Sequence, residues 1–76
     1  MSDQPTCLDL RGLKCPLPAL FARRALARSL PGTVIEVIAD DPLAPVDLPH
    51  MCVQEGYEVI DSARAADCLR ILLRRP

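Results

Sequence analysis

The sequence predicts a two-layer α/β fold in the order β-α-β-α-β-β, with four strands in one sheet and both helices packed on one face. Residues 6–10 alternate apolar and polar side chains, which is typical of a half-buried strand. Residues 16–30 are rich in Ala, Leu and Arg and end at a Pro-Gly pair, as a helix does. A chain of 76 residues buries only one small core, so we expect a single domain over residues 1–76, with residues 1–5 as a flexible tail.

The composition is that of a globular domain, since 50% of the residues are apolar and 25% are charged. A formal charge of −1 gives no global attraction to nucleic acid. Phe21 and Tyr57 are the only aromatic side chains, which argues against a base-stacking surface. No basic segment precedes an apolar run and no apolar stretch approaches the length of a membrane span, so we expect no signal peptide, no membrane association and a cytoplasmic protein.

The four cysteines are Cys7, Cys15, Cys52 and Cys68. In the cytoplasm they are expected to be reduced. They form no Cys-x-x-Cys pair, and His50 with Cys52 is the only close pair of metal-ligand residues. We therefore expect no metal site.

The first half of the chain sets up a parallel strand pair. Leu8 and Leu10 share one face of the strand over residues 6–10, and Arg11-Gly12 turns the chain. The second strand, residues 33–39, is a run of Val and Ile broken by Glu36. A strand-helix-strand order implies a right-handed crossover and parallel pairing of these two strands.

The helix over residues 16–30 has a core face and a basic face. The core face is formed by Ala19, Ala22, Leu26 and Leu30. Arg24 and Arg28 lie opposite. Leu17 and Phe21 fall closer to the arginine side, where either a loop or strand covers them or they form a docking surface ringed by Arg23, Arg24 and Arg28.

Asp40-Asp41-Pro42 ends the second strand. Two adjacent carboxylates suggest metal or acid–base chemistry, but neighbouring positions on a strand point apart and acidic residues before proline commonly form turns. We therefore expect a turn here. Any functional role of Asp40, Asp41 or Asp47 is left open.

The second helix is expected to begin with Asp47 as its N-cap, because a start at Pro45 would place Pro49 where it removes a helix hydrogen bond. The face shared by Leu48, Met51, Cys52 and Glu55 should pack on the sheet, and Gly56 supplies the stop. Cys52 is thus expected to be a packed thiol.

Two strands complete the sheet, residues 57–61 and 68–74, with a polar turn over residues 62–67 between them. Leu69, Ile71 and Leu73 should face the helices. The open face should carry the charged residues Asp9, Glu36, Arg70 and Arg74, together with Cys7 and Cys68 as minor surface or edge residues.

The stretch Arg11-Gly12-Leu13-Lys14-Cys15-Pro16-Leu17-Pro18 carries the chemistry. Pro16 suits the first position of a helix, which makes Cys15 the N-cap. There the helix dipole and Lys14 both favour the thiolate, so a lowered pKa of the thiol is expected. With Pro18 also in the first turn, the free amides near the sulfur should be those of Leu17 and Ala19. The alternative is a half-buried, structural Cys15.

These pieces together resemble the TusA/SirA-like family of small sulfur-carrier proteins. The resemblance spans residues 8–74: Leu8-Asp9, then Gly12-Leu13-Lys14 with the Cys-Pro-x-Pro motif, Pro31-Gly32, Ala39-Asp40-Asp41-Pro42 and Asp47-Leu48-Pro49. It implies a two-layer α/β sandwich with a four-stranded mixed sheet. In the family this position of the motif is variable and acidic in some members, so the resemblance implies a different choice of partner for a chain with Leu17 there.

The resemblance implies transfer of persulfide sulfur by a sulfurtransferase that acts as a stoichiometric relay. Cys15 would accept sulfane sulfur from a cysteine desulfurase or rhodanese and pass it to an acceptor protein, serving tRNA 2-thiouridine modification, sulfur oxidation or other sulfur and selenium pathways. No metal or organic cofactor and no direct nucleic-acid contact are implied, and we expect a monomer. Gly12, Pro16 and Pro18 are assigned to geometry, and Lys14 and Arg11 to the electrostatics of the thiolate.

Two other functions compete with the carrier. The first is a regulatory or adaptor module that binds a protein through Leu17, Phe21 and Arg24. The second is a thiol redox protein, against which the missing Cys-x-x-Cys motif argues.

Overall fold

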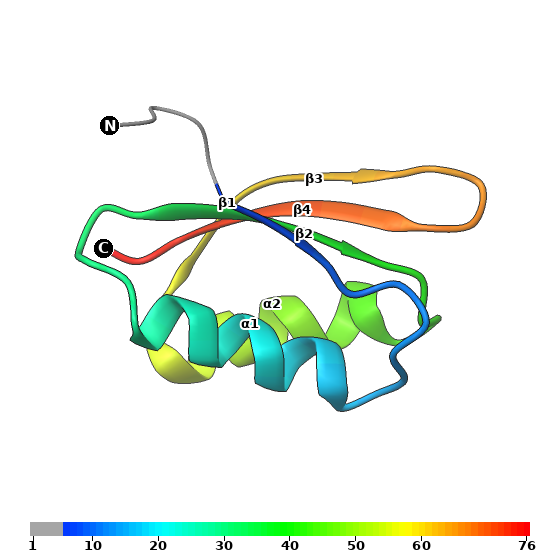
Figure 1. The fold of residues 1–76 in the computed structure, drawn as a ribbon, viewed down its shortest axis with the longest axis horizontal. Coiled ribbons are helices and arrows are strands. Elements are labelled where there is room, and N and C mark those ends of the chain that lie inside the picture. The colour runs from blue at the N-terminus through cyan, green and yellow to red at the C-terminus, as the bar shows by residue number, and fades with distance from the viewer. Residues whose placement is uncertain (1–5) are drawn as a thin grey trace.

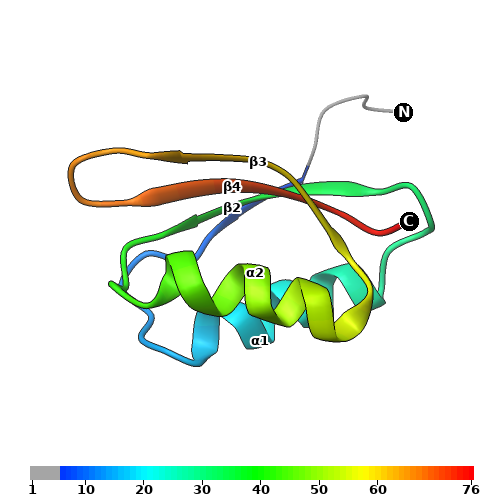
Figure 2. The ribbon, with the colours of Figure 1, turned by 180° about the vertical axis from the view of Figure 1, so that it is seen from behind.

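The computed structural model describes residues 6–76 and contains two layers, a sheet and a pair of helices that cover one of its faces (Figure 1, Figure 2). The predicted tail, residues 1–5, lies outside the described residues. The elements in chain order are β1 (Thr6–Asp9), α1 (Leu17–Ala27), β2 (Val34–Ala39), α2 (Ala44–Glu55), β3 (Glu58–Arg64) and β4 (Leu69–Arg74). The predicted fold class and element order are confirmed.

The sheet is mixed and has the strand order β1-β2-β4-β3. β1 pairs in parallel with β2, as the crossover rule predicts, whereas β4 runs antiparallel to both β2 and β3. Because β1 and β2 are parallel, their carboxyl ends lie at the same end of the sheet. The segments that lead into α1 and α2 therefore start side by side, and this arrangement positions the site described below.

The core lies between the sheet and the helices. Alternate residues of β2 and β4 face the helices, so that Ile35, Val37 and Ala39 pack beside Leu69, Ile71 and Leu73. The helices contribute Ala22 and Leu26 from α1 and Ala44, Leu48, Met51 and Cys52 from α2. Cys52 is 1% exposed, which confirms its predicted packing role.

The other face of the sheet carries charge, as predicted. Glu36 of β2 pairs with Arg70 of β4, and Arg74 of β4 pairs with Glu58 of β3 at 2.8 Å. Cys7 is exposed on this face opposite Glu36, and this carboxylate is the main cause of the raised pKa of its thiol. Cys7 is thus a surface residue of the edge strand β1.

α1 ends at Ala27, three residues before the predicted end at Leu30. The Ser29 hydroxyl donates to the Ala25 carbonyl at 2.7 Å, and the Arg75 guanidinium donates to the carbonyls of Leu26, Ala27 and Ser29. These contacts satisfy the last carbonyls of the helix without a further turn. Leu30 is therefore 79% exposed, and its predicted place in the core is wrong.

α2 begins at Ala44, so the prediction of Asp47 as its N-cap is wrong. The Asp41 side chain accepts a hydrogen bond from the Leu43 amide at 2.9 Å and organises the turn before the helix. Pro49 consequently lies inside the helix and removes one bond, to the Pro45 carbonyl. The lost hydrogen bond alone costs about 1 kcal/mol. The earlier start of the helix buries Ala44, which is 1% exposed. Glu55, predicted on the packed face, is exposed.

β3 is longer than predicted and runs through residues 62–64, where a turn was expected. Its backbone pairs with β4 as far as Arg64 opposite Leu69, with a register shift between Val59 and Asp61. Pairing with a neighbouring strand outweighs the weak strand preference of Ser and Asp. The hairpin closes through the Ala65 amide and the Cys68 carbonyl at 2.9 Å.

Candidate functional site

The turn between β1 and α1 is fixed from both sides. Gly12 adopts φ +88°, a conformation that favours glycine, and its amide donates to the Asp40 carboxylate at 2.9 Å. The Arg11 guanidinium forms an ion pair with Asp9, 2.7 Å from Nη2 to Oδ2, and holds the pKa of that carboxyl at about 2. Asp40 thus has a structural role: it anchors the turn that leads to Cys15.

Cys15 is exposed and stands one residue before the position that we predicted. Pro16 is the N-cap of α1, Leu17 is the first helical residue and Pro18 the second, with a cis peptide bond between Cys15 and Pro16. The Leu17 amide donates to the Lys14 carbonyl at 2.8 Å and is not free to bind an anion. Of the two amides expected near the sulfur, only the Ala19 amide is left to bind an anion.

Cys15 lines a hollow of about 220 Å³ between the two helices. Pro16, Ala19, Leu20 and Arg23 line it from α1 and its N-cap; Asp47, His50, Met51, Gln54 and Glu55 line it from α2. Asp47 is half-buried in the first turn of α2. The site therefore joins the start of α1 to the start of α2, although Cys15 and Asp47 are far apart in the sequence.

The pKa of the Cys15 thiol is raised, contrary to the prediction. A side-chain hydrogen bond to Asp47 is the main cause, followed by desolvation and by the negative charges of Asp47 and Asp41. Arg11 is engaged by Asp9, and neither Arg11 nor Lys14 is among the groups that shift this pKa. The resting sulfur is thus a thiol held beside a carboxylate.

An exposed apolar surface adjoins this hollow along α1. We call it the α1 surface; its residues are Leu17, Leu20, Phe21, Arg23, Arg24, Ala27 and, from α2, Glu55. Leu17 is 39% and Phe21 41% exposed, which decides between the two alternatives left by the sequence. The residues of the α1 surface surround a shallow hollow of about 540 Å³. Arg28 is not among the lining residues.

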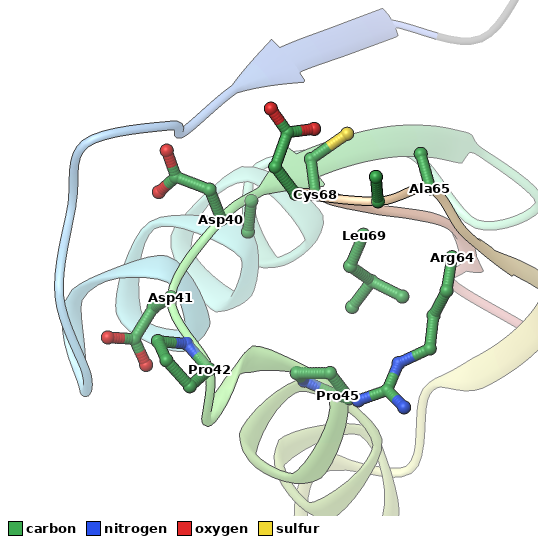
Figure 3. A pocket seen from close by; sticks show the side chains of 11 residues that line it. Asp40, Asp41, Pro42, Pro45, Arg64, Ala65, Cys68 and Leu69 are labelled. Carbon is green, nitrogen blue, oxygen red and sulfur yellow. The ribbon is translucent and has the colours of Figure 1, made fainter.

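A third hollow, of about 350 Å³, lies between the end of β2, the start of α2 and the β3–β4 hairpin (Figure 3). Figure 3 shows Leu69 at its floor and the Arg64 side chain extending toward Pro45. Cys68 lies at its rim, half-buried, as an edge residue should be. Asp40 and Asp41 also line the hollow, but their carboxylates already accept backbone hydrogen bonds.

Within residues 6–76, no group of three or more His, Cys, Asp or Glu side chains is placed to hold a metal ion. His50 is exposed while Cys52 is buried, so this close pair in the sequence does not converge. Burial raises the pKa of the Cys52 thiol to about 11. In the same part of the chain, no helix is long and apolar enough to cross a membrane.

Residues 6–75 match the family model described as sulfurtransferase TusA. The chain belongs to this family. Its curated relatives include two proteins of Neisseria meningitidis, from serogroups A and B, each named "Putative sulfur carrier protein" and each 46% identical over 56 residues. These alignments cover 74% of this chain and 76% of the relative. A protein of the same name from Archaeoglobus fulgidus is 38% identical over 60 residues, 79% of this chain and 78% of the relative.

The fold of this TusA-family chain is also similar to a solved structure. The SirA-like protein of Desulfitobacterium hafniense superposes with a TM-score of 0.78 over 91% of this chain and 95% of that one, at 24% identity. This likeness concerns the fold. Together with the family match, it places the chain among small sulfur-carrier proteins with a two-layer α/β architecture.

Sequence reasoning missed two site residues, Asp47 and Leu20. Asp47 was assigned to capping α2, although parallel pairing of the first two strands brings the starts of both helices to one end of the sheet, a signal that could have placed it near Cys15. Leu20 was not considered, although it follows Leu17 by three residues, a spacing that places two side chains on one face of a helix. The structure leaves it exposed between Leu17 and Phe21.

Proposed function

We propose that this protein accepts sulfane sulfur on Cys15 as a persulfide and passes it to a cysteine of an acceptor protein. The thiol attacks the outer sulfur of a donor persulfide, the donor's S–S bond breaks, and the donor leaves as a thiol that takes up the proton. Sulfur moves between two thiols with no net oxidation. The reaction therefore needs no cofactor.

The observation that carries this proposal is the exposure of Cys15 at the tip between the helices, within a chain of the TusA family. A partner protein can therefore reach the Cys15 sulfur. It cannot reach the sulfur of Cys52, because that residue is buried. Cys7 lies on β1 and Cys68 lines the hollow shown in Figure 3, and neither is among the residues that line the Cys15 hollow. We therefore assign the carrier role to Cys15.

We assign the supporting residues to geometry more than to charge. Gly12 permits the turn that Asp40 anchors, while Pro16 and Pro18 fix the entry to α1. Arg11 supports the site through its ion pair with Asp9, at the far side of the same turn. We assign Lys14, exposed beside Cys15, to the attraction of an acidic partner surface.

We propose the α1 surface as the docking area for the protein partners. Leu17, Leu20 and Phe21 provide an apolar centre, and Arg23 and Arg24 provide a basic rim that suits an acidic surface. We take the donor to be a cysteine desulfurase or a rhodanese. The acceptor is a relay protein that serves tRNA thiolation or sulfur oxidation.

The direct test of the carrier role is incubation with a cysteine desulfurase and cysteine, followed by peptide mass spectrometry. We expect one added sulfur atom on the Cys15 peptide and none on that peptide in Cys15→Ser. Cys68→Ser is the matched control and should load as the wild type does. Loading of Cys68 instead of Cys15 would contradict the assignment.

The docking surface has its own test, Phe21→Asp. An acidic group in the apolar centre should weaken desulfurase binding and lower the loading rate by about tenfold, a typical cost for an interface residue of 1–2 kcal/mol. Alkylation of Cys15 by a small reagent should be unchanged. The matched control is Val53→Asp, at an exposed apolar residue outside the α1 surface. Equal loading rates for Phe21→Asp and the wild type would show that partners dock elsewhere.

The same surface supports a second candidate, an adaptor that binds a partner without transferring sulfur. The exposed Leu17, Leu20 and Phe21 favour it, since an apolar group of this kind suits partner binding whether or not Cys15 reacts. Cellular activity that survives Cys15→Ser but is lost in Phe21→Asp would favour the adaptor. Loss in both variants would favour the carrier.

A further inference from the structure

The Asp47 carboxylate has an unusual environment for a charged group. Its Oδ2 oxygen is buried and has no hydrogen-bond partner among the described residues. Burying a carboxylate oxygen without a donor is costly, and buried polar groups in folded proteins are nearly always paired. The Cys15 thiol lies on the wall of the same hollow, and Asp47 is the main cause of its raised pKa. The two residues are therefore neighbours across the hollow, and we treat them as a pair.

Several other groups surround this pair. The charged or titratable side chains that line the hollow or adjoin it are Lys14 next to Cys15, Arg23 of α1, Asp41 before α2, and His50 and Glu55 of α2. Of these, Asp41 acts on Cys15 in the same direction as Asp47 and more weakly. The charges that act on the sulfur are thus negative.

This environment treats the two states of the carrier differently. The unloaded thiol is neutral and can donate its proton to the carboxylate. The loaded persulfide is a stronger acid than a thiol, so at neutral pH it is an anion beside Asp47, where like charges repel. The negative charges of Asp47 and Asp41 therefore favour the unloaded thiol over the loaded persulfide.

We propose, on the basis of the proposed carrier function, that Asp47 sets how readily the Cys15 persulfide gives up its outer sulfur. Asp47 stabilises the unloaded thiol and destabilises the anionic persulfide, and it thereby favours release of sulfur. In the release step the acceptor sulfur bonds to the outer sulfur of the Cys15 persulfide and the S–S bond to Sγ breaks. The acceptor's proton ends on Sγ, and the negative charge leaves with the new persulfide. Atoms, electrons and charge balance without an oxidant or reductant.

The first test measures the thiol alone and needs no sulfur transfer. The rate of Cys15 alkylation by iodoacetamide is followed from pH 6 to 10 by peptide mass spectrometry. Asp47→Asn should move the midpoint of the profile to lower pH. For a shift of about one unit, the rate at neutral pH rises about threefold, because a tenfold gain in thiolate is partly offset by lower nucleophilicity.

Two variants control this test. Asp47→Glu keeps the charge and should keep the midpoint close to that of the wild type. Asp61→Asn removes one negative charge from β3, outside the hollow, and should leave the midpoint unchanged. An unchanged midpoint in Asp47→Asn, or an equal shift in Asp61→Asn, would overturn the proposal.

The second test measures the exchange equilibrium of Cys15 with glutathione and glutathione persulfide. The Asp47→Asn variant should retain sulfur more strongly, with a loading constant roughly threefold to tenfold above the wild type, since one pKa unit corresponds to a factor of ten. Equal constants would contradict the role of Asp47. A wild type that takes up no sulfur would instead contradict the carrier function itself, whatever the alkylation profiles show.

Circular dichroism melting checks that each variant folds. If Asp47→Asn does not fold, Asp41→Asn replaces it, because asparagine keeps the side-chain acceptor for the Leu43 amide and removes only the charge. Its midpoint and loading constant should move in the same directions by a smaller factor. No movement in either quantity would overturn the proposal.

Discussion

Cys15 and Cys52 are two thiols whose chemistry follows from what surrounds them. Cys52 is buried among apolar side chains of the core, and burial raises its pKa to about 11. Cys15 is exposed, yet its pKa is also raised, here mainly by the Asp47 carboxylate. Cys52 is thereby closed to reaction, while Cys15 stays accessible in a protonated resting form.

The buried Cys52 predicts a loss of stability at alkaline pH. The unfolded chain releases the Cys52 proton near pH 9.0, whereas the folded chain holds it to about pH 11. The stabilisation is therefore complete below the unfolded pKa and is lost as pH rises toward the folded one. Urea unfolding should show the wild type losing roughly 2 kcal/mol relative to Cys52→Ala between pH 8 and 11. Parallel pH profiles of the two proteins would contradict this.

The raised pKa of the Cys15 thiol could not be predicted from its neighbours in the sequence. Lys14 and the start of α1 suggested a lowered pKa of the thiol, because both are local features. The dominant contact comes from Asp47, on another helix. A one-residue shift of the cap to Pro16 and the engaged Leu17 amide also reduce what α1 can offer the sulfur.

At the scale of elements, the end of α1 depends on a residue from the far end of the chain. The Nη1 nitrogen of Arg75 lies 3.3 Å from the Leu26 carbonyl and 3.0 Å from that of Ala27, and it also contacts the Ser29 carbonyl. A cation at this position complements the negative end of the helix dipole. Arg75 thus ties the C-terminal segment to α1.

We predict that Arg75→Ala lowers the free energy of unfolding by about 1–2 kcal/mol, since it removes charge-assisted hydrogen bonds to helix-terminal carbonyls. Urea denaturation monitored by circular dichroism measures this. Arg64→Ala, in the exposed hairpin, should change the value by less than about 0.5 kcal/mol. Equal effects of the two substitutions would show that Arg75 does not cap the helix.

The elements themselves were largely predictable, and their ends were less so. Alternation in β2 and β4 and the Pro-Gly stop after α1 are local signals, and the strands agree with the prediction within a residue or so, apart from β3. The ends of α1 and β3 and the start of α2 differ because Arg75, β4 and the Asp41 turn act on them. These contacts either join segments that are distant in the sequence or favour one of two possible helix starts. The helix and strand preferences of single residues therefore do not predict them.

At the scale of the whole molecule, the sheet has a buried centre, formed by β2 and β4, and an exposed edge at β3. β2 and β4 lie at the centre of the sheet and β3 at one edge (Figure 2). Buried residues alternate along β2 and β4, whereas every residue of β3 is exposed. Local opening is least costly where few apolar contacts are lost. The β3 side of the sheet should therefore open most readily.

Hydrogen exchange at neutral pH measures this difference. We expect backbone amides of residues 35–39 and 69–73 to exchange most slowly, and those of residues 60–64 to exchange faster by at least an order of magnitude. Equal protection of β3 and β2 would contradict the expected division of the sheet.

The architecture also explains how a short chain assembles a site from separate segments. Parallel pairing of β1 and β2 sets the starts of α1 and α2 at one end of the sheet, which brings Cys15 to Asp47. The α1 surface runs from this point along the same helix. The fold class and the exposure of Cys15, Leu17 and Phe21 could be predicted from the sequence. The carboxylate beside the thiol could not, because it depends on the packing of the two helices.

The central claim is that Cys15 carries the transferred sulfur. Its most direct measurement is intact and peptide mass spectrometry after incubation with a cysteine desulfurase and cysteine. We expect one added sulfur atom, located on Cys15, removed by a reducing thiol and absent from Cys15→Ser. A wild-type protein that gains no sulfur, or a Cys15→Ser variant that gains as much as the wild type, would contradict the account.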